Sequence, residues 1–302
     1  MPQPAEKDVI SGMVALIGPP NVGKSTLLNN LLGQKISIVS PKPQTTRTRN
    51  LGILNGPDYQ VVLLDTPGIH QAGSPLNRNM VRVAVETLAE VDAIIFMVDV
   101  TFPLPGQGEV ATATGHLKGL DRPAILVINK IDLVGREQLL PILLAYQEVY
   151  PFKALLPISA LQDDGTALLL KELLPLLPTG PRLYPEDIPT DASERFIVGE
   201  LIREKIFLLT GQEIPYSTAV TVDSFKEDPG RGLVTIHATI YVEKGSQKAI
   251  VIGKQGSKLQ QIGRAARIDI EAMLDQKVFL KLFIKVRKNW TRDDTFLRDM
   301  GL

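Results

Sequence analysis

The sequence contains no cysteine, one tryptophan and three histidines, and aromatic residues make up 5% of its 302 residues. Without cysteine, disulfides, thiolate metal sites and cysteine nucleophiles are excluded. No apolar run approaches the roughly 18 residues that a membrane-spanning helix needs. Net charge is also absent, because 33 basic residues balance 33 acidic ones. We therefore expect a cytoplasmic protein, with at most a weak peripheral contact at the inner membrane.

The composition that remains is that of a globular chain, with 44% hydrophobic and 22% charged residues. A length of 302 residues favours two domains. In the first part, short β-branched runs alternate with amphipathic stretches, which predicts a doubly wound, mostly parallel α/β sheet. The expected strands are 13–17, 61–64, 93–98, 124–128 and 155–158, an antiparallel edge pairs 50–54 with 60–64, and the expected helices include 77–90 and 136–148.

A proline-rich break follows, at Pro178, Pro181, Pro185 and Pro189. Such a stretch supports neither helix nor sheet and is typical of a linker. We assign 1–178 to the first domain, 179–190 to the linker and 191–302 to a smaller α+β domain. In that domain we expect a helix capped by Asp191 and Glu194, inward-facing strands at 234–242 and 278–286, and a helix over 257–274.

The segment Gly18–Ser25 reads Gly-Pro-Pro-Asn-Val-Gly-Lys-Ser and matches the pattern G-x-x-x-x-G-K-S/T. It lies between an expected strand and an expected helix, where such a P-loop wraps backbone N–H groups around phosphates. Lys24 would neutralise the β- and γ-phosphates, and Ser25 would ligate Mg²⁺. The predicted nucleotide-binding residues of this segment are Gly18, Pro19, Pro20, Asn21, Val22, Gly23, Lys24, Ser25 and Thr26.

Two further segments follow buried strands. Asp65-Thr66-Pro67-Gly68 places a carboxylate for Mg²⁺ and a glycine amide for the γ-phosphate at a strand end, and Ile69 comes next. In Asn129-Lys130-Ile131-Asp132, the Asp132 carboxylate can accept the two N–H groups of guanine that adenine lacks. Backbone groups of Ser159, Ala160 and Leu161 would read the guanine O6 atom. The order of these elements predicts GTP and GDP as ligands.

The chain resembles the Era family of small GTPases over nearly its whole length, including Gln44-Thr45-Thr46-Arg47. The resemblance implies an α/β P-loop NTPase G domain followed by an α+β type II KH domain. It places Thr45 and Thr46 in the effector loop; one of them would close on Mg²⁺, and we favour Thr46. Family members are thought to use the P-loop asparagine, here Asn21, to hold K⁺.

Hydrolysis would depend on Lys24, Thr46 and Gly68. Ile69 occupies the position of the water-orienting glutamine of Ras-like proteins and cannot hydrogen-bond a water molecule. We therefore expect slow intrinsic turnover, accelerated by K⁺ or a partner. His70 is close enough to be considered as a base, but we interpret it as a solvated loop residue.

The second domain carries Gly253-Lys254-Gln255-Gly256 before a helix, and twelve basic residues stand against four acidic ones between Tyr241 and Arg292. A loop with two glycines lets a phosphate backbone approach closely, as in KH domains that hold about four nucleotides. Phe279 and Phe283 offer base stacking as an alternative to core packing. The predicted RNA-binding residues are Ile252, Gly253, Lys254, Gln255, Gly256 and Lys258.

The resemblance implies that the RNA is the single-stranded 3′ end of 16S ribosomal RNA, and that the protein acts in 30S ribosomal subunit assembly, as a monomer. Two alternatives remain open. One is a GTPase that assists tRNA modification, against which the absence of cysteine counts. The other is a regulatory GTPase at a membrane surface, whose basic face would meet anionic lipid.

Overall fold

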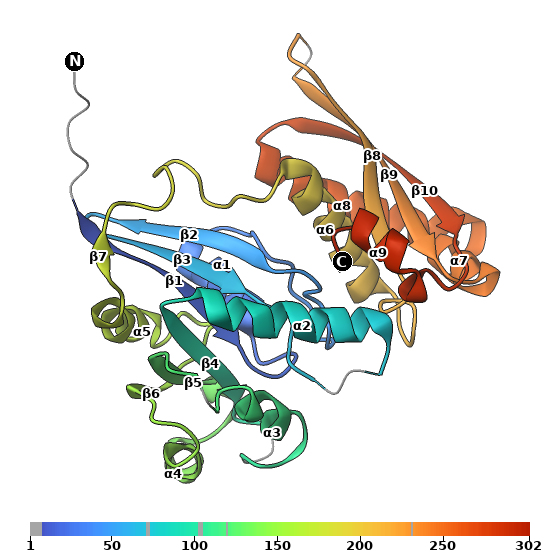
Figure 1. Cartoon of the computed structure of the whole chain (residues 1–302). Coiled ribbons are helices and arrows are strands. Elements are labelled where there is room, and N and C mark those ends of the chain that lie inside the picture. Colours follow the sequence, from blue (N-terminus) through green and yellow to red (C-terminus); the bar gives the residue numbers. More distant parts are fainter. Residues whose placement is uncertain (1–7, 71–72, 102–104, 119, 231) are drawn as a thin grey trace, which may run out of the picture. The chain divides into compact units, whose positions relative to one another are not determined.

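The computed structural model describes residues 8–70, 73–101, 105–118, 120–230 and 232–302. The chain forms two compact units. The described residues of the first fall within Met1–Ser37, Thr46–Gly73 and Asn77–Asp191, and those of the second within Ile38–Thr45, Ser74–Leu76 and Ala192–Leu302. Each unit has its own buried core. Figure 1 labels the helices and strands of both units.

The first unit is built on one sheet with the strand order β2-β3-β1-β4-β5-β6. Strands β3, β1, β4, β5 and β6 run parallel, whereas β2 pairs antiparallel with β3 along the edge. The strands are β1 (Val9–Ile17), β2 (Asn50–Gly56), β3 (Tyr59–Asp65), β4 (Ala93–Asp99), β5 (Ala124–Asn129) and β6 (Ala154–Pro157).

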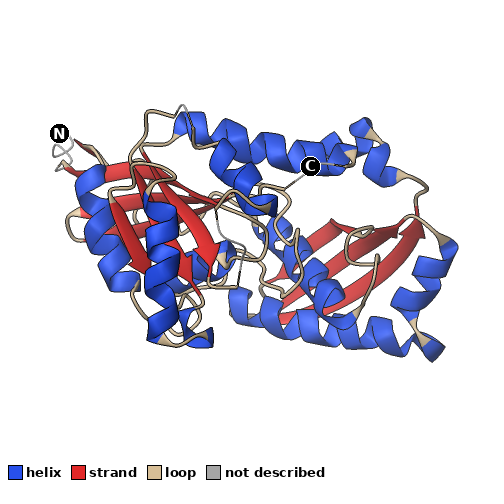
Figure 2. Cartoon of the chain, turned by 90° about the horizontal axis from the view of Figure 1, so that it is seen from below, coloured by secondary structure: helices blue, strands red, loops and turns tan. Residues whose placement is uncertain are grey.

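Helices cover both faces of this sheet, as Figure 2 shows in blue against the red strands. On one face lie α1 (Lys24–Leu32) and α5 (Thr166–Leu173). On the other lie α2 (Pro75–Glu90), α3 (Gly108–Gly115) and α4 (Leu139–Gln147). Short 3-10 turns add η1 (Ile131–Leu133), η2 (Arg136–Gln138) and η3 (Leu174–Leu176).

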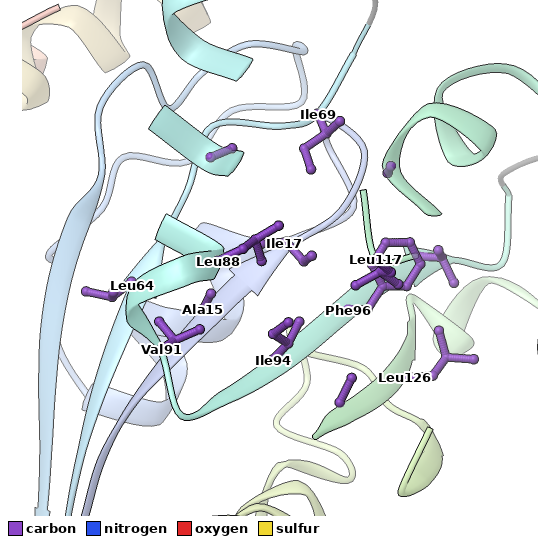
Figure 3. Close-up of a cluster of buried hydrophobic side chains, with 14 of the residues drawn as sticks. Ala15, Ile17, Leu64, Ile69, Leu88, Val91, Ile94, Phe96, Leu117 and Leu126 are labelled. Carbon is purple, nitrogen blue, oxygen red and sulfur yellow. The ribbon is translucent and has the colours of Figure 1, made fainter. Parts of the chain in front are cut away.

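The central strands are buried on both faces, which explains their nearly unbroken apolar sequences. Every residue of β4 is buried. Its alternate side chains Ile94 and Phe96 enter one core, where Figure 3 shows them near Ala15 and Ile17 of β1 and Leu126 of β5. This rigid sheet fixes the loops that leave its carboxyl edge.

The predicted linker is attached to the first unit, and part of it forms a strand. Its first residues form β7 (Thr179–Gly180), which pairs antiparallel with β1, so the expectation that this stretch supports no sheet is corrected there. Further on, the buried amide of Gln60 accepts hydrogen bonds from the backbone N–H groups of Leu183 and Tyr184. Composition cannot reveal such attachment, because prolines prevent regular pairing but leave carbonyls and neighbouring amides available.

The second unit packs helices on a three-stranded sheet of order β10-β9-β8. The buried core of this unit contains residues of α6, α7, α8, β9 and β10. The elements are α6 (Glu194–Leu209), β8 (Ala219–Asp228), β9 (Leu233–Val242), α7 (Gly245–Ile252), η4 (Lys254–Gly256), α8 (Ser257–Leu274), β10 (Lys277–Val286), η5 (Trp290–Arg292) and α9 (Asp294–Asp299).

Two sequence expectations for this unit are corrected, and one strand of it was not predicted. The cap of α6 is Ser193, whose side chain accepts the Phe196 N–H, so Asp191 lies outside the helix. Val286, expected to face inward, is exposed. Strand β8 was not predicted, because its irregularity between Val222 and Ser224 breaks the alternation on which such a prediction depends. Within the described residues, no helix has the length and apolarity to cross a bilayer.

Candidate guanine-nucleotide and RNA sites

Residues of the P-loop connect β1 to α1 at the carboxyl edge of the sheet, where a doubly wound fold binds its ligands. Gly18, Pro19 and Pro20 are buried, as are Val22 and Lys24. Asn21 is exposed and has a positive φ of 63°. Gly23, Ser25 and Thr26 are half-buried. The segment thus presents an ordered turn directly before the N-terminus of a helix, which favours an anion.

Three oxygen-bearing side chains meet beside this turn. The Ser25 hydroxyl donates to Asp65 Oδ2 at 2.7 Å and lies 3.0 Å from Thr46 Oγ1. The Thr46 hydroxyl is 3.4 Å from the same carboxylate oxygen. Two hydroxyls and one carboxylate are hard oxygen donors of the kind that Mg²⁺ prefers. By contrast, the neighbouring Thr45 hydroxyl bonds Ser40 and the Lys42 carbonyl.

Lys24 is buried, and its ammonium donates to the carbonyls of Gly18 and Pro19 at 3.2 and 2.9 Å. Burial lowers the pKa of Lys24 to about 8, although the negative charge of Asp65 opposes the shift. Burial likewise raises the pKa of the Asp65 carboxyl, and Lys24 is the largest opposing influence. The pair therefore lies in a region where charge is costly, and where added phosphate charge would act strongly on Lys24.

A proton uptake is expected when nucleotide binds above neutral pH. With its pKa near 8, Lys24 is mostly neutral at pH 8.5, and adjacent phosphates would raise that pKa and restore the ammonium. Calorimetric titration with GDP in buffers of different ionisation enthalpy should show a larger proton uptake at pH 8.5 than at pH 7. Equal uptake at both pH values would contradict this assignment.

The segment after β3 lies against the P-loop. A side chain at Gly68 would come within 2.6 Å of the Cα atom of Pro20, so only glycine allows this approach. Asp65, Thr66, Pro67 and Gly68 are all buried, and the Thr66 hydroxyl donates to the Leu16 carbonyl. Backbone close to the phosphate-binding turn can respond to the terminal phosphate.

Neither Ile69 nor His70 lies in a solvated loop, because both side chains are buried. Ile69 is fully buried in the core shown in Figure 3. His70 is 3% exposed, and its Nδ1 lies 2.7 Å from the Gly68 carbonyl. The interpretation of His70 as a solvated residue is therefore wrong. The sequence gives no signal that His70 is buried, because histidine is polar. Its burial follows from that of its apolar neighbour Ile69.

The residues expected to read guanine also meet at one place. The buried Asn129 amide donates to the Val22 carbonyl at 2.7 Å and accepts the Ala160 N–H at 2.8 Å. It therefore joins the P-loop to the segment after β6. The carboxylate of Asp132 is exposed, and the Ser159 hydroxyl orients it through a 2.6 Å hydrogen bond. Leu161 is 77% exposed beside them.

In the second unit, the predicted RNA loop joins α7 to α8. Positive φ angles at Gly253, Gln255 and Gly256 turn the backbone sharply. At Gly253 a Cβ would come within 2.6 Å of the Lys258 Cβ, so the loop requires glycine there. Lys254 and Gln255 are exposed, whereas Ile252 and Lys258 are half-buried. The loop thus offers a glycine backbone and an exposed cation on one side of the unit.

A groove of about 780 Å³ begins at this loop and runs between α8 and β10. Its lining includes Gln260, Arg264 and Arg267, which sequence reasoning did not select. Their spacing of four and three residues, following the glycine loop, is the signal that could have identified them. Phe279 lines the groove and is 54% exposed, while Phe283 is 40% exposed and lies under Lys281. Both rings are therefore outside the core.

Comparison with known families agrees with the two units. The family described as 50S ribosome-binding GTPase matches residues 13–130, and the KH domain family matches residues 213–291. The chain is 51% identical to GTPase Era of Syntrophus aciditrophicus, over 96% of this chain and 94% of that protein. It is 52% identical to GTPase Era of Geobacter metallireducens, over 96% and 97%.

Solved structures give the same result. A crystal structure of Era with MgGDPNP and nucleotides 1506–1542 of 16S ribosomal RNA superposes with a TM-score of 0.93, at 40% identity, over 97% of this chain and 99% of that one. A variant of Aquifex aeolicus Era bound to GDP and AlF4⁻ gives 0.92 at 39%, with the same coverage. The predicted fold class, a P-loop G domain followed by a KH domain, is confirmed.

Proposed function

We propose that this chain, which belongs to the GTPase Era family and hydrolyses GTP, captures the 3′ end of 16S ribosomal RNA during 30S subunit assembly. The observation that carries this proposal is the glycine loop of the KH domain, which opens onto a groove lined by basic and aromatic side chains. A relative of 40% identity binds that RNA in its crystal structure. Assembly of the subunit would place the work in the cytoplasm.

In the nucleotide site, the P-loop residues from Gly18 to Thr26 would hold the phosphates. Ser25, Thr46 and Asp65 form the oxygen cluster suited to Mg²⁺, which would supply charge neutralisation at the phosphates. Lys24 would hold the same phosphates through its ammonium. The amide of Gly68 would meet the γ-phosphate, and Asp132, oriented by Ser159, would accept the guanine N–H groups.

The two effector-loop threonines give a matched test of the Mg²⁺ assignment. Thr46→Val removes a hydroxyl from the cluster, whereas Thr45→Val removes one that bonds Ser40 and Lys42. We expect Thr46→Val to lower kcat about a hundredfold and to raise the Mg²⁺ concentration needed for half-maximal activity. Thr45→Val should change that concentration less than about threefold. The reverse pattern would assign the ligand to Thr45.

Slow hydrolysis and dependence on K⁺ belong to the same proposal. Ile69 is buried and offers no group to orient water, so turnover requires another source of charge or positioning. The exposed Asn21 would supply an oxygen for K⁺ near the phosphates. We expect K⁺ in place of Na⁺ at equal ionic strength to raise kcat about tenfold, and Asn21→Ala to remove the difference. A fast rate indifferent to K⁺ would contradict this role.

The RNA site would combine the loop with α8. Gly253 and Gly256, with Lys254 and Gln255 between them, would hold the phosphate backbone, and Lys258 would add charge. Ile252 is half-buried at the edge of the loop and would contact a base. Arg264 and Arg267 extend the basic lining along the groove, and the exposed ring of Phe279 can stack on a base.

Crosslinking of cellular RNA to the full chain tests the RNA proposal. The 3′ end of 16S ribosomal RNA should dominate the map, and crosslinked peptides should come from residues 252–267. Enrichment of tRNA would favour the alternative of a tRNA-modification partner, and a chain that binds anionic vesicles but no RNA would favour the membrane-surface alternative. The monomeric state and any contact with the inner membrane stay predictions.

A further inference from the structure

Asp99 is a buried carboxylate that none of the sequence motifs includes. It is the last residue of β4 and pairs in register with Asn129, the last residue of β5. Its side chain has no exposed surface. A buried carboxylate is costly unless it is paired and hydrogen-bonded, so its partners indicate what it does.

The two oxygens of Asp99 differ in their contacts, because Oδ1 is hydrogen-bonded and Oδ2 has an ion pair as its contact among the described residues. Oδ1 accepts the backbone N–H of Thr101 at 2.8 Å and also bonds the Thr101 hydroxyl. Oδ2 lies 2.6 Å from the Lys130 ammonium. Asp99 is itself the last residue of β4, and its Oδ1 contacts orient the carboxylate against the turn that follows the strand.

Lys130 connects Asp99 to the P-loop. Its ammonium donates to the carbonyl of Asn21 at 2.7 Å while it pairs with Asp99. Both Asn21 and Lys130 have positive φ angles, of 63° and 65°, a conformation that is uncommon for lysine and more readily adopted by asparagine. The three residues therefore join the carboxyl ends of β4 and β5 to the turn that faces the phosphates.

We propose that Asp99 is a positioning residue of the guanine-nucleotide site, which holds the Lys130 ammonium against the Asn21 carbonyl and thereby slows the release of nucleotide. This inference rests on the proposed nucleotide site. Lys130 is two residues from the guanine-reading Asp132, and its ammonium bonds the P-loop at Asn21, so a lysine anchored at its tip links the two parts of that site. Without the carboxylate, the Asn21 carbonyl would have to hold the ammonium against solvent, to which the Lys130 side chain is already 27% exposed.

A simpler role would be local. Asp99 could serve only to hold the turn at Thr101, through the two hydrogen bonds of Oδ1. The two roles differ in their dependence on Lys130. A positioning role requires the lysine, whereas a local role acts equally well without it. Coupling between the two side chains therefore separates them.

The test measures release of a fluorescent GDP analogue from the full chain in four forms: wild type, Asp99→Asn, Lys130→Met and the double variant. We expect Asp99→Asn to speed release about tenfold, a change of 1.4 kcal/mol. In the Lys130→Met background, Asp99→Asn should add less than about twofold. The KM for GTP should rise by a larger factor than kcat falls. Asp121→Asn, the same substitution at an exposed position, is the matched control.

Three results would overturn the inference: unchanged release from Asp99→Asn, the same acceleration with and without Lys130, or an equal acceleration from Asp121→Asn. Should Lys130→Met not fold, Lys130→Gln replaces it, since its amide is too short to bridge both partners. Failure of the underlying site is distinguishable, because Asp132→Asn would then leave guanine preference unchanged as well. A normal response to Asp132→Asn with none to Asp99→Asn rejects the positioning role alone.

Discussion

Asp132→Asn is expected to lower the affinity for GTP on the order of a thousandfold and to create a preference for xanthosine triphosphate. The exposed carboxylate, oriented by Ser159, offers two acceptor oxygens. Guanine presents two donors to that pair, and an amide replaces one acceptor by a donor that has nothing to meet. Xanthine carries a carbonyl at the mismatched position and restores the match. Competition binding with the two nucleotides measures the exchange.

The matched control for this exchange is Asp164→Asn, which makes the same substitution at a nearby exposed position. It should leave GTP affinity within about twofold of the wild type. Unchanged GTP affinity in Asp132→Asn would show that Asp132 is not the residue that reads the guanine base. A loss of GTP affinity without a gain for the xanthine nucleotide would instead indicate that the substitution disturbs the P-loop through its neighbours.

Gly256→Asp is the second change with a large expected effect. Gly256 has a φ of 82° with open space around it, so a side chain there is strained but meets no atom. Its carboxylate would project where the phosphate backbone is proposed to lie, and like charges repel. We expect RNA affinity to fall about a hundredfold at low salt, with GTP hydrolysis retained, because the loop belongs to the KH unit. Titration of the full chain with a labelled RNA measures the loss.

Gly211→Asp provides the control for that experiment. It introduces the same charge in the same unit, at an exposed glycine with open space and no unusual φ. RNA affinity should change by less than about threefold. An equal loss in both variants would show that overall charge, rather than the loop, governs binding. Retained affinity in Gly256→Asp would exclude the loop as the phosphate contact.

The sequence predicted the architecture of the first unit well because its strands are buried on both faces. The runs around Val61–Leu64 and Ala93–Val98 are apolar for that reason, and the structure has strands there. The P-loop pattern predicted the turn between β1 and α1, because fixed glycines and a lysine at fixed spacing have few other uses.

Structural features that depend on tertiary contacts gave no signal in the local sequence. The attachment of residues 179–190 depends on Gln60, far away in the chain, and β8 depends on pairing with β9 across an irregularity. The role of Asp99 could not be read from its neighbours either. Its partner Lys130 comes from another strand end, and only the fold brings the two together. Patterns of this kind need a structure.

Calorimetric titration of the purified chain with GTP and with ATP, in millimolar Mg²⁺, tests the central claim most directly. We expect saturable heat with GTP and none with ATP at the same concentrations, because only guanine matches the acceptors of Asp132. Absence of heat with GTP, or tighter binding of ATP, would contradict the account.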